Sequence, residues 1–110
     1  MKKLNYEFTD SDIKTLVFCL KVIPFVDFHD VSPVQQEINN SLAISAIEKL
    51  LNRTTDISIN ELRIMSVALD LAYLISVDDS PYKISSEANT DFSPYIFSIN
   101  KLRNQFSTFL

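Results

Sequence analysis

The 110-residue chain is long enough for one folded domain with a single hydrophobic core, which we expect to span residues 1–110. Apolar residues make up 46% of it, a content too high for an intrinsically disordered segment. The chain has fourteen acidic and ten basic residues, and the basic residues form no run. This argues against a nucleic-acid partner, because nucleic-acid-binding surfaces neutralise phosphates with lysine and arginine.

The chain contains no glycine, whereas average usage would put about eight in this length. Phosphate-binding loops, dinucleotide-binding fingerprints and nucleophile elbows need glycine for positive φ or for close backbone approach, so all three are excluded. Tight β-hairpins also depend on glycine at their turns. The composition therefore favours an all-α domain whose helices are joined by connections containing Asn, Ser and Pro.

The first predicted helix covers about residues 9–22. Thr9 is suited to cap it, and Phe8 can pack against Ile13 as a hydrophobic staple. Two aspartates lie in the first turn, where the helix dipole favours negative charge. Apolar residues then recur at helical spacing, and Pro24 is expected to end the helix.

Two short stretches beside this helix have strand-like sequences. Residues 4–8 alternate apolar and polar side chains, and residues 22–28 are rich in β-forming residues. They are compatible with a short two-stranded pairing, which would be marginal without helices packed behind it.

The second predicted helix covers about residues 33–52. Ser32 can cap it, Pro33 suits the first helical position, and Gln35 supplies the third position of a capping box. The helix is expected to bury a stripe of apolar residues spaced three and four apart. This stripe comprises Ile38, Leu42, Ala43, Ala46, Ile47, Leu50 and Leu51.

The third predicted helix, about 58–76, has the clearest start, because Ser58 and Glu61 form a capping box. The helix is apolar around most of its circumference. A helix of this kind is typically packed by neighbours on two sides, so we expect it to be the central helix of the fold.

The polar positions of this third helix form one narrow strip. They are Arg63, Ser66, Asp70 and Tyr73. Asp70 either faces water or pairs with a cation such as Arg63 or Arg103, and we expect the solvent-exposed position because charged residues are rarely fully buried.

The fourth predicted helix covers about residues 93–108, with Ser93 as its cap and Pro94 at its first position. Its apolar stripe comprises Ile96, Ile99, Leu102, Phe106 and Phe109. Phe97 lies off this stripe, so it either packs against Phe92 or is exposed.

The single histidine and single cysteine limit metal and catalytic chemistry. His29 with Asp27 or Asp30 could supply a metal ligand or a general base, but a metal site needs three or four converging ligands, so a solvated loop histidine is expected. Cys19 has apolar neighbours, which predicts an inert packed thiol, and a Cys19–His29 dyad would require the two to meet in space. We expect no catalytic residue, metal or cofactor.

Residues 77–91 form a polar, acidic segment without periodicity, and loops of this length are often functional. Its adjacent aspartates lack the alternating ligands and the glycine of a calcium loop, so solvation is the expected state. Surplus apolar surface commonly marks an interface with a partner. The residues expected to contact a partner are Asp78, Asp79, Tyr82, Phe97, Phe109 and Leu110.

These features together predict a non-enzymatic protein–protein interaction module of the size and shape of small bacterial or phage accessory, inhibitor or immunity proteins. Because polar residues interrupt the apolar stretches, we expect neither a signal peptide nor a membrane-spanning segment. One cysteine suits a reducing compartment, so a cytoplasmic location without membrane partners is expected. A homo-oligomeric structural subunit, with a homodimer interface on the last helix, is the alternative. A metal-dependent protein using His29 with Asp27 or Asp30 is a minor alternative.

Overall fold

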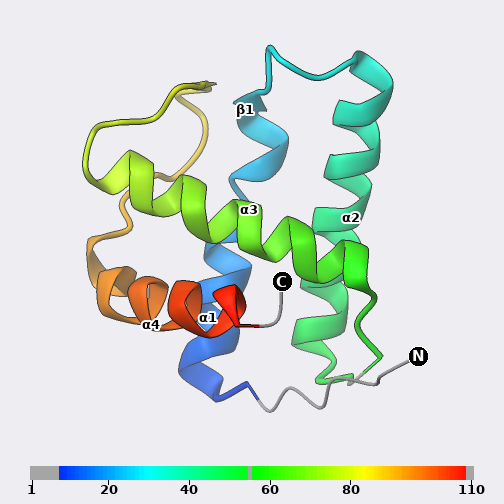
Figure 1. The fold of residues 1–110 in the computed structure, drawn as a ribbon, viewed down its shortest axis with the longest axis vertical. Coiled ribbons are helices and arrows are strands. Elements are labelled where there is room, and N and C mark those ends of the chain that lie inside the picture. Colours follow the sequence, from blue (N-terminus) through cyan, green and yellow to red (C-terminus); the bar gives the residue numbers. More distant parts are fainter. Residues whose placement is uncertain (1–7, 55, 109–110) are drawn as a thin grey trace.

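The computed structural model describes residues 8–54 and 56–108, and four α-helices account for most of them. The helices are α1 (Asp10–Leu20), α2 (Pro33–Leu51), α3 (Ile59–Ser76) and α4 (Ile96–Ser107). Two short 3₁₀ helices, η1 (Ile23–Phe25) and η2 (Ser93–Tyr95), and two short strands, β1 (Val26–Asp27) and β2 (Lys83–Ile84), complete the described elements (Figure 1). The predicted all-α fold with four helices is confirmed.

The two strands pair antiparallel, with Val26 opposite Ile84 and Asp27 opposite Lys83. A strand within residues 22–28 is therefore confirmed, but its partner lies in the 77–91 segment rather than at residues 4–8. Of the latter, Phe8 is not in a strand, and residues 4–7 lie outside the described residues. The pair is supported from behind by the core, because Val26 is buried and Ile84 packs against the buried cluster.

Reciprocal capping boxes start α1 and α3; the sequence predicts the box at α3, and at α1 it predicts Thr9 as the cap. At α1 the Thr9 hydroxyl accepts from the backbone N–H of Asp12, whose carboxylate accepts from the backbone N–H of Thr9. At α3 Ser58 and Glu61 form the same pair of bonds. Each box satisfies two backbone donors that the helix itself cannot.

The starts of α2 and α4 differ from the prediction. Ser32 accepts from the N–H of Gln35, but the Gln35 side chain donates to Asn39 instead of returning to the cap, so only half of a capping box forms. Ser93 begins η2 rather than α4, and its N–H and hydroxyl donate to Asp91. Because this first turn closes as a 3₁₀ helix, α4 starts later, without a side-chain cap.

The C-termini of α2 and α3 both end in a Schellman motif without glycine. The residue after each cap, Arg53 or Asp78, is in the left-handed region, with φ of 52° and 56°. The next amide donates to a carbonyl five residues earlier, as Asp79 does to Leu74 at 2.8 Å. The chain has no glycine to occupy these positions, so Arg53 and Asp78 adopt the left-handed conformation, which is less favourable for residues with a side chain.

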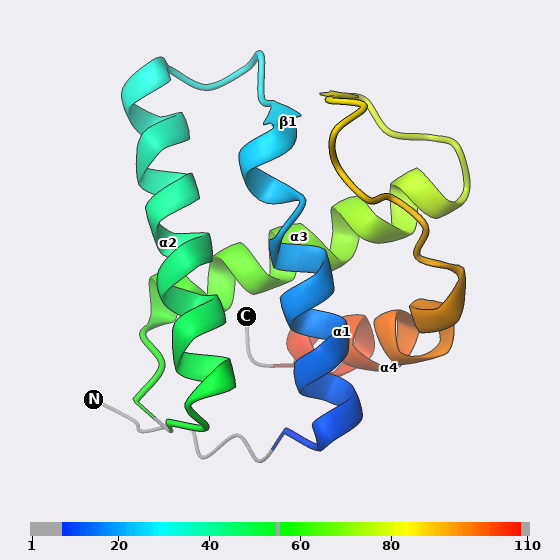
Figure 2. The same cartoon turned by 180° about the vertical axis from the view of Figure 1, so that it is seen from behind.

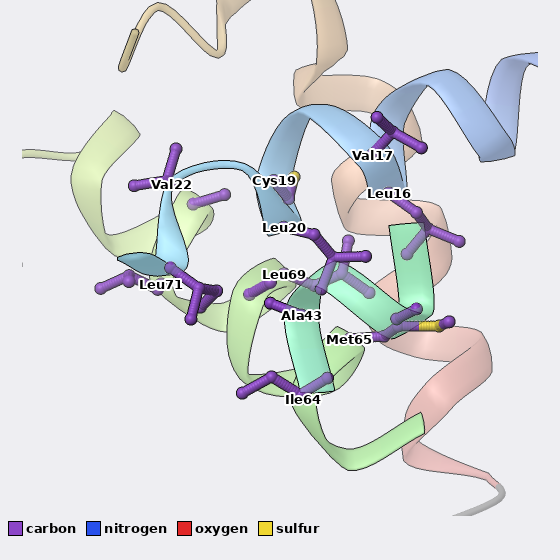
Figure 3. Packing of buried hydrophobic residues seen from close by; sticks show 14 of the residues in the cluster. Leu16, Val17, Cys19, Leu20, Val22, Ala43, Ile64, Met65, Leu69 and Leu71 are labelled. Atoms are coloured by element: carbon purple, nitrogen blue, oxygen red, sulfur yellow. The ribbon is translucent and has the colours of Figure 1, made fainter. Parts of the chain in front are cut away.

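The core forms where α3 meets the other three helices, since α3 contacts α1, α2 and α4. Figures 1 and 2 show α3 crossing α1 and α2, with α4 beside it. In Figure 3, Leu16 and Leu20 of α1 and Ala43 of α2 lie against Met65 and Leu69 of α3. Burying one large apolar side chain stabilises the folded state by roughly 1.5–3 kcal/mol. Because α3 has apolar residues around most of its circumference, it buries most of them by lying between the other helices, as predicted.

The buried stripe of α2 is narrower than predicted. Its buried members are Ala43, Ala46 and Leu50, and its half-buried members are Leu42 and Ile47. Ile38 and Leu51 are instead 46% and 62% exposed, so assigning them to the core was wrong. The two alanines let the backbones of α1 and α3 approach α2 closely, which leaves the larger residues around them uncovered.

Candidate functional site

The long loop after α3 is fastened to the connection between β1 and α2 through Tyr82. The Tyr82 hydroxyl donates to Asp30 at 2.8 Å, and this hydrogen bond raises the pKa of the phenol. The Tyr82 ring meets Phe28 edge-on, with centroids 4.9 Å apart, and lies 5.3 Å from the ring of His29. These contacts and the β1–β2 pair hold the loop in a defined place.

A cavity of about 360 Å³ opens between this loop and the C-terminal end of α3. Its apolar lining comes from Ile75, Ile84 and Ala88, which pack against the core. Its polar lining residues are Asp78, Ser80, Tyr82, Ser85, Ser86 and Thr90. We call it the loop cavity.

The structure brings together two of the predicted partner residues. Asp78 and Tyr82 line the loop cavity. Asp78 and the neighbouring Asp79 are both exposed, but Asp79 does not line the cavity. Phe97 is 83% exposed on α4, so of its two expected environments the exposed one is found. The other two predicted residues, Phe109 and Leu110, lie outside the described residues.

His29 and Cys19 occupy opposite environments. His29 is exposed beside Tyr82, and within residues 8–54 and 56–108 no group of three or more metal-ligating side chains gathers. Cys19 is buried, and burial raises the pKa of its thiol from 9.0 to about 12. The thiol is therefore protonated at neutral pH and is a poor nucleophile.

The polar strip of α3 combines the two environments expected for Asp70. The carboxylate is exposed, and it accepts a hydrogen bond from Nε of Arg103 at 2.9 Å. The Arg103 guanidinium also lies 4.1 Å from the centre of the Tyr73 ring. This exposed pair joins α3 to α4 and has the ordinary, small energy of a surface ion pair.

A second feature, on α2, was missed by the sequence reasoning. Val34 and Ile38 are 67% and 46% exposed, and with the half-buried Leu42 they recur every four residues along one side of the helix. Together with Glu37, Ser41 and Ser45 they line a shallow groove of about 480 Å³. We call these six residues the outer α2 face. The four-residue spacing was visible in the sequence, but it was assigned to the core.

Behind the outer α2 face lies a buried carboxylate. Glu61, only 2% exposed, accepts from the Ser45 hydroxyl at 2.6 Å, from Nζ of Lys49 at 2.7 Å and from the N–H of Ser58 at 2.8 Å. Burial raises the pKa of this carboxyl, but the hydrogen bonds from Lys49, Ser45 and Ser58 lower it more, from 4.5 to about 2. The ammonium of Lys49 therefore binds Glu61 within the contact between α2 and α3.

Comparison with protein-family models, with curated proteins and with solved structures found no match. None of the helices in the described part of the chain has the length and hydropathy that crossing a bilayer requires. Function is therefore inferred from the geometry of the chain's own residues.

Proposed function

We propose that the protein acts by binding another protein, and that the outer α2 face receives an amphipathic helix of that partner. The observation that carries the proposal is the apolar row of the outer α2 face, in which Val34 and Ile38 are exposed and Leu42 is half-buried. The buried residues of α2, which include Ala43 and Leu50, lie outside this row and already supply the helix's main share of the core. Exposed apolar residues beyond those that the core uses, here Val34 and Ile38, are typical of helix-in-groove recognition.

The dimensions of this face suit a helix. Its apolar residues span about two turns of α2, and Figures 1 and 2 both place α2 at the edge of the molecule. Ser41 and Ser45 are small, so a second helix can approach to the usual packing distance of roughly 8–10 Å.

The charges beside this face favour a different protein over a second copy of the chain. Glu37 and Glu48 project from the same side of α2, and the nearby Lys49 is bound to Glu61. An antiparallel pair of copies would bring the acidic edges of both α2 helices together without a free cation. A partner helix with lysine or arginine beside its apolar row would neutralise them.

A synthetic peptide provides the test. We expect a helical peptide of about 15 residues, with leucines every three to four residues and flanking lysines, to bind saturably in fluorescence anisotropy. Ile38→Glu should weaken binding about ten-fold or more, because it places a charge in the middle of the apolar row.

Ile44→Glu is the matched control, since Ile44 is 52% exposed on the same helix but does not line the groove, and it should leave the affinity unchanged. Equal binding by both variants would contradict the proposal. So would equal binding of a peptide in which glutamates replace the flanking lysines.

A further inference from the structure

We propose that the loop cavity binds a cationic alkyl group, that is, an ammonium or guanidinium carried on an aliphatic chain. Its volume of about 360 Å³ lies within the range of small-molecule sites, roughly 300–1,000 Å³. The site is separate from the outer α2 face, so this inference goes beyond the proposed function and does not depend on it.

The charge of the cavity is negative and uncompensated. Asp78 lines it, and among the described residues its carboxylate has no ion-pair or hydrogen-bond partner. The cavity also adjoins the C-terminal end of α3, where the helix dipole is negative and the last turn contains no basic residue. Lys83 lies between Tyr82 and Ile84, which both line the cavity, so strand alternation directs it to the other face.

The lining matches the two parts of such a ligand. Ile75, Ile84 and Ala88 offer an apolar surface for methylene groups. Ser86 and Thr90 also line the cavity, and their hydroxyls make no hydrogen bond within residues 8–54 and 56–108, so they are free to accept N–H donors. An ammonium has three donors and a guanidinium five, enough to bond the carboxylate and both hydroxyls together.

The surrounding charges would attract a cation before it reaches the cavity. The carboxylates on β1, on the connection that follows it and on the 77–91 loop are Asp27, Asp30, Asp78, Asp79, Glu87 and Asp91. In the same segments Lys83 is the only basic residue besides His29. The four ion pairs found among the described residues all lie on the helices or at their ends, away from these segments. A one-signed region of this kind raises the local concentration of oppositely charged ligands.

Simple amines test the charge requirement. We expect n-butylamine and n-butylguanidine to cause saturable amide shifts at residues 75–90 in ¹⁵N-resolved NMR titrations, whereas n-butanol, with the same chain and no charge, should not. Asp78→Asn should weaken amine binding about ten-fold or more, because it removes the charge while asparagine tolerates the left-handed conformation at this position.

Asp79→Asn is the matched control, because it removes the adjacent charge outside the cavity, and it should change the affinity by less than about two-fold. Equal shifts with n-butanol, or unchanged binding by Asp78→Asn, would overturn the inference. So would the absence of saturable shifts with either amine.

A last comparison separates the two sources of such a group. A capped tripeptide with a central arginine that binds more tightly than n-butylguanidine indicates an arginine or lysine side chain of a protein, and weaker peptide binding indicates a free amine. Ile38→Glu should leave amine binding unchanged, so failure of this inference and failure of the proposed α2 interaction are distinguishable.

Discussion

Glu61 is a buried carboxylate whose hydrogen-bond partners all come from α2 and the start of α3. A buried charge is tolerated only when paired and hydrogen-bonded, and Ser45, Lys49 and Ser58 together meet this requirement. The residue caps a helix and also joins two helices. Its contribution to stability should therefore exceed that of an ordinary capping residue.

We expect Glu61→Gln to lower the free energy of unfolding by about 1–3 kcal/mol at neutral pH, because the amide cannot replace the charge-assisted bonds from Lys49 and Ser45. Urea unfolding measures the change. Glu48→Gln removes an exposed acid from α2 and should change stability by less than about 0.5 kcal/mol. Similar losses in the two variants would show that the Glu61 contacts contribute little.

The same group predicts a pH dependence. Its pKa is about 2 in the folded protein and 4.5 ordinarily, so the folded state favours the ionised form. The stability it supplies is fully present above pH 4.5 and is lost as the pH falls from 4.5 towards 2. Unfolding curves across this range should be steeper in pH for the wild-type protein than for Glu61→Gln. Parallel curves would contradict the assignment.

Sequence reasoning predicted half of the Glu61 site. The capping box with Ser58 is a local pattern, four residues long, and is readable without a structure. Ser45 and Lys49 contact the same carboxylate from 16 and 12 residues away. Which turn of α2 meets the start of α3 depends on the packing of the two helices, and no local spacing specifies it.

At the level of the elements, the unusual feature is how α3 ends. Asp78 takes the left-handed position of the Schellman motif, where glycine is usual, and its carboxylate lies at the negative end of the helix dipole. Both effects cost stability. The same carboxylate is what makes the loop cavity attractive to a cation, so the cost is consistent with a binding role.

We expect Asp78→Gly to raise the free energy of unfolding by roughly 0.5–1 kcal/mol, because glycine relieves the backbone strain and the carboxylate is removed. Thermal or urea unfolding provides the measurement. Asp79→Gly is the control and should bring no gain, since this residue has no positive φ and glycine adds entropy to the unfolded chain. Stabilisation by Asp79→Gly alone would contradict the explanation.

The helix α2 shows why periodicity alone could not locate the exposed apolar face. Apolar residues occur around much of the circumference of α2, so the i, i+4 pattern fits two different faces. Ala43 and Ala46 determine which face is buried, because these small residues allow α1 and α3 to approach α2 on their side. Small residues mark the close contact here, and the larger Ile38 remains exposed.

For the molecule as a whole, the four helices were predictable because each has apolar residues at helical spacing. The central position of α3 was predictable from the apolar width of that one helix. The loop cavity was not. It requires the 77–91 loop to fold back and pair Ile84 with Val26, a contact across 58 residues that a pattern along the chain does not contain. Asp78 and Tyr82 were selected for charge and aromaticity, and the folding of the loop is what places them together.

The oligomeric state tests the alternative of a homo-oligomeric subunit. Phe97 is the most exposed large apolar side chain of the described residues, but its neighbours along α4 are the polar Ser98, Asn100 and Lys101. A stable interface buries about 800 Å² per partner, far more than one ring supplies, so we expect a monomer by sedimentation equilibrium. A dimer that dissociates on Phe97→Asp would instead establish the homo-oligomeric alternative.

The burial of Cys19 near the C-terminal end of α1 has a practical consequence. It is the only cysteine in the chain, and its thiol meets solvent only when the helices separate. The rate at which a thiol reagent modifies the native protein is therefore a direct measure of how often the bundle opens. Mass spectrometry can follow the modification of Cys19 in the absence of denaturant, so this residue serves as an intrinsic probe of unfolding.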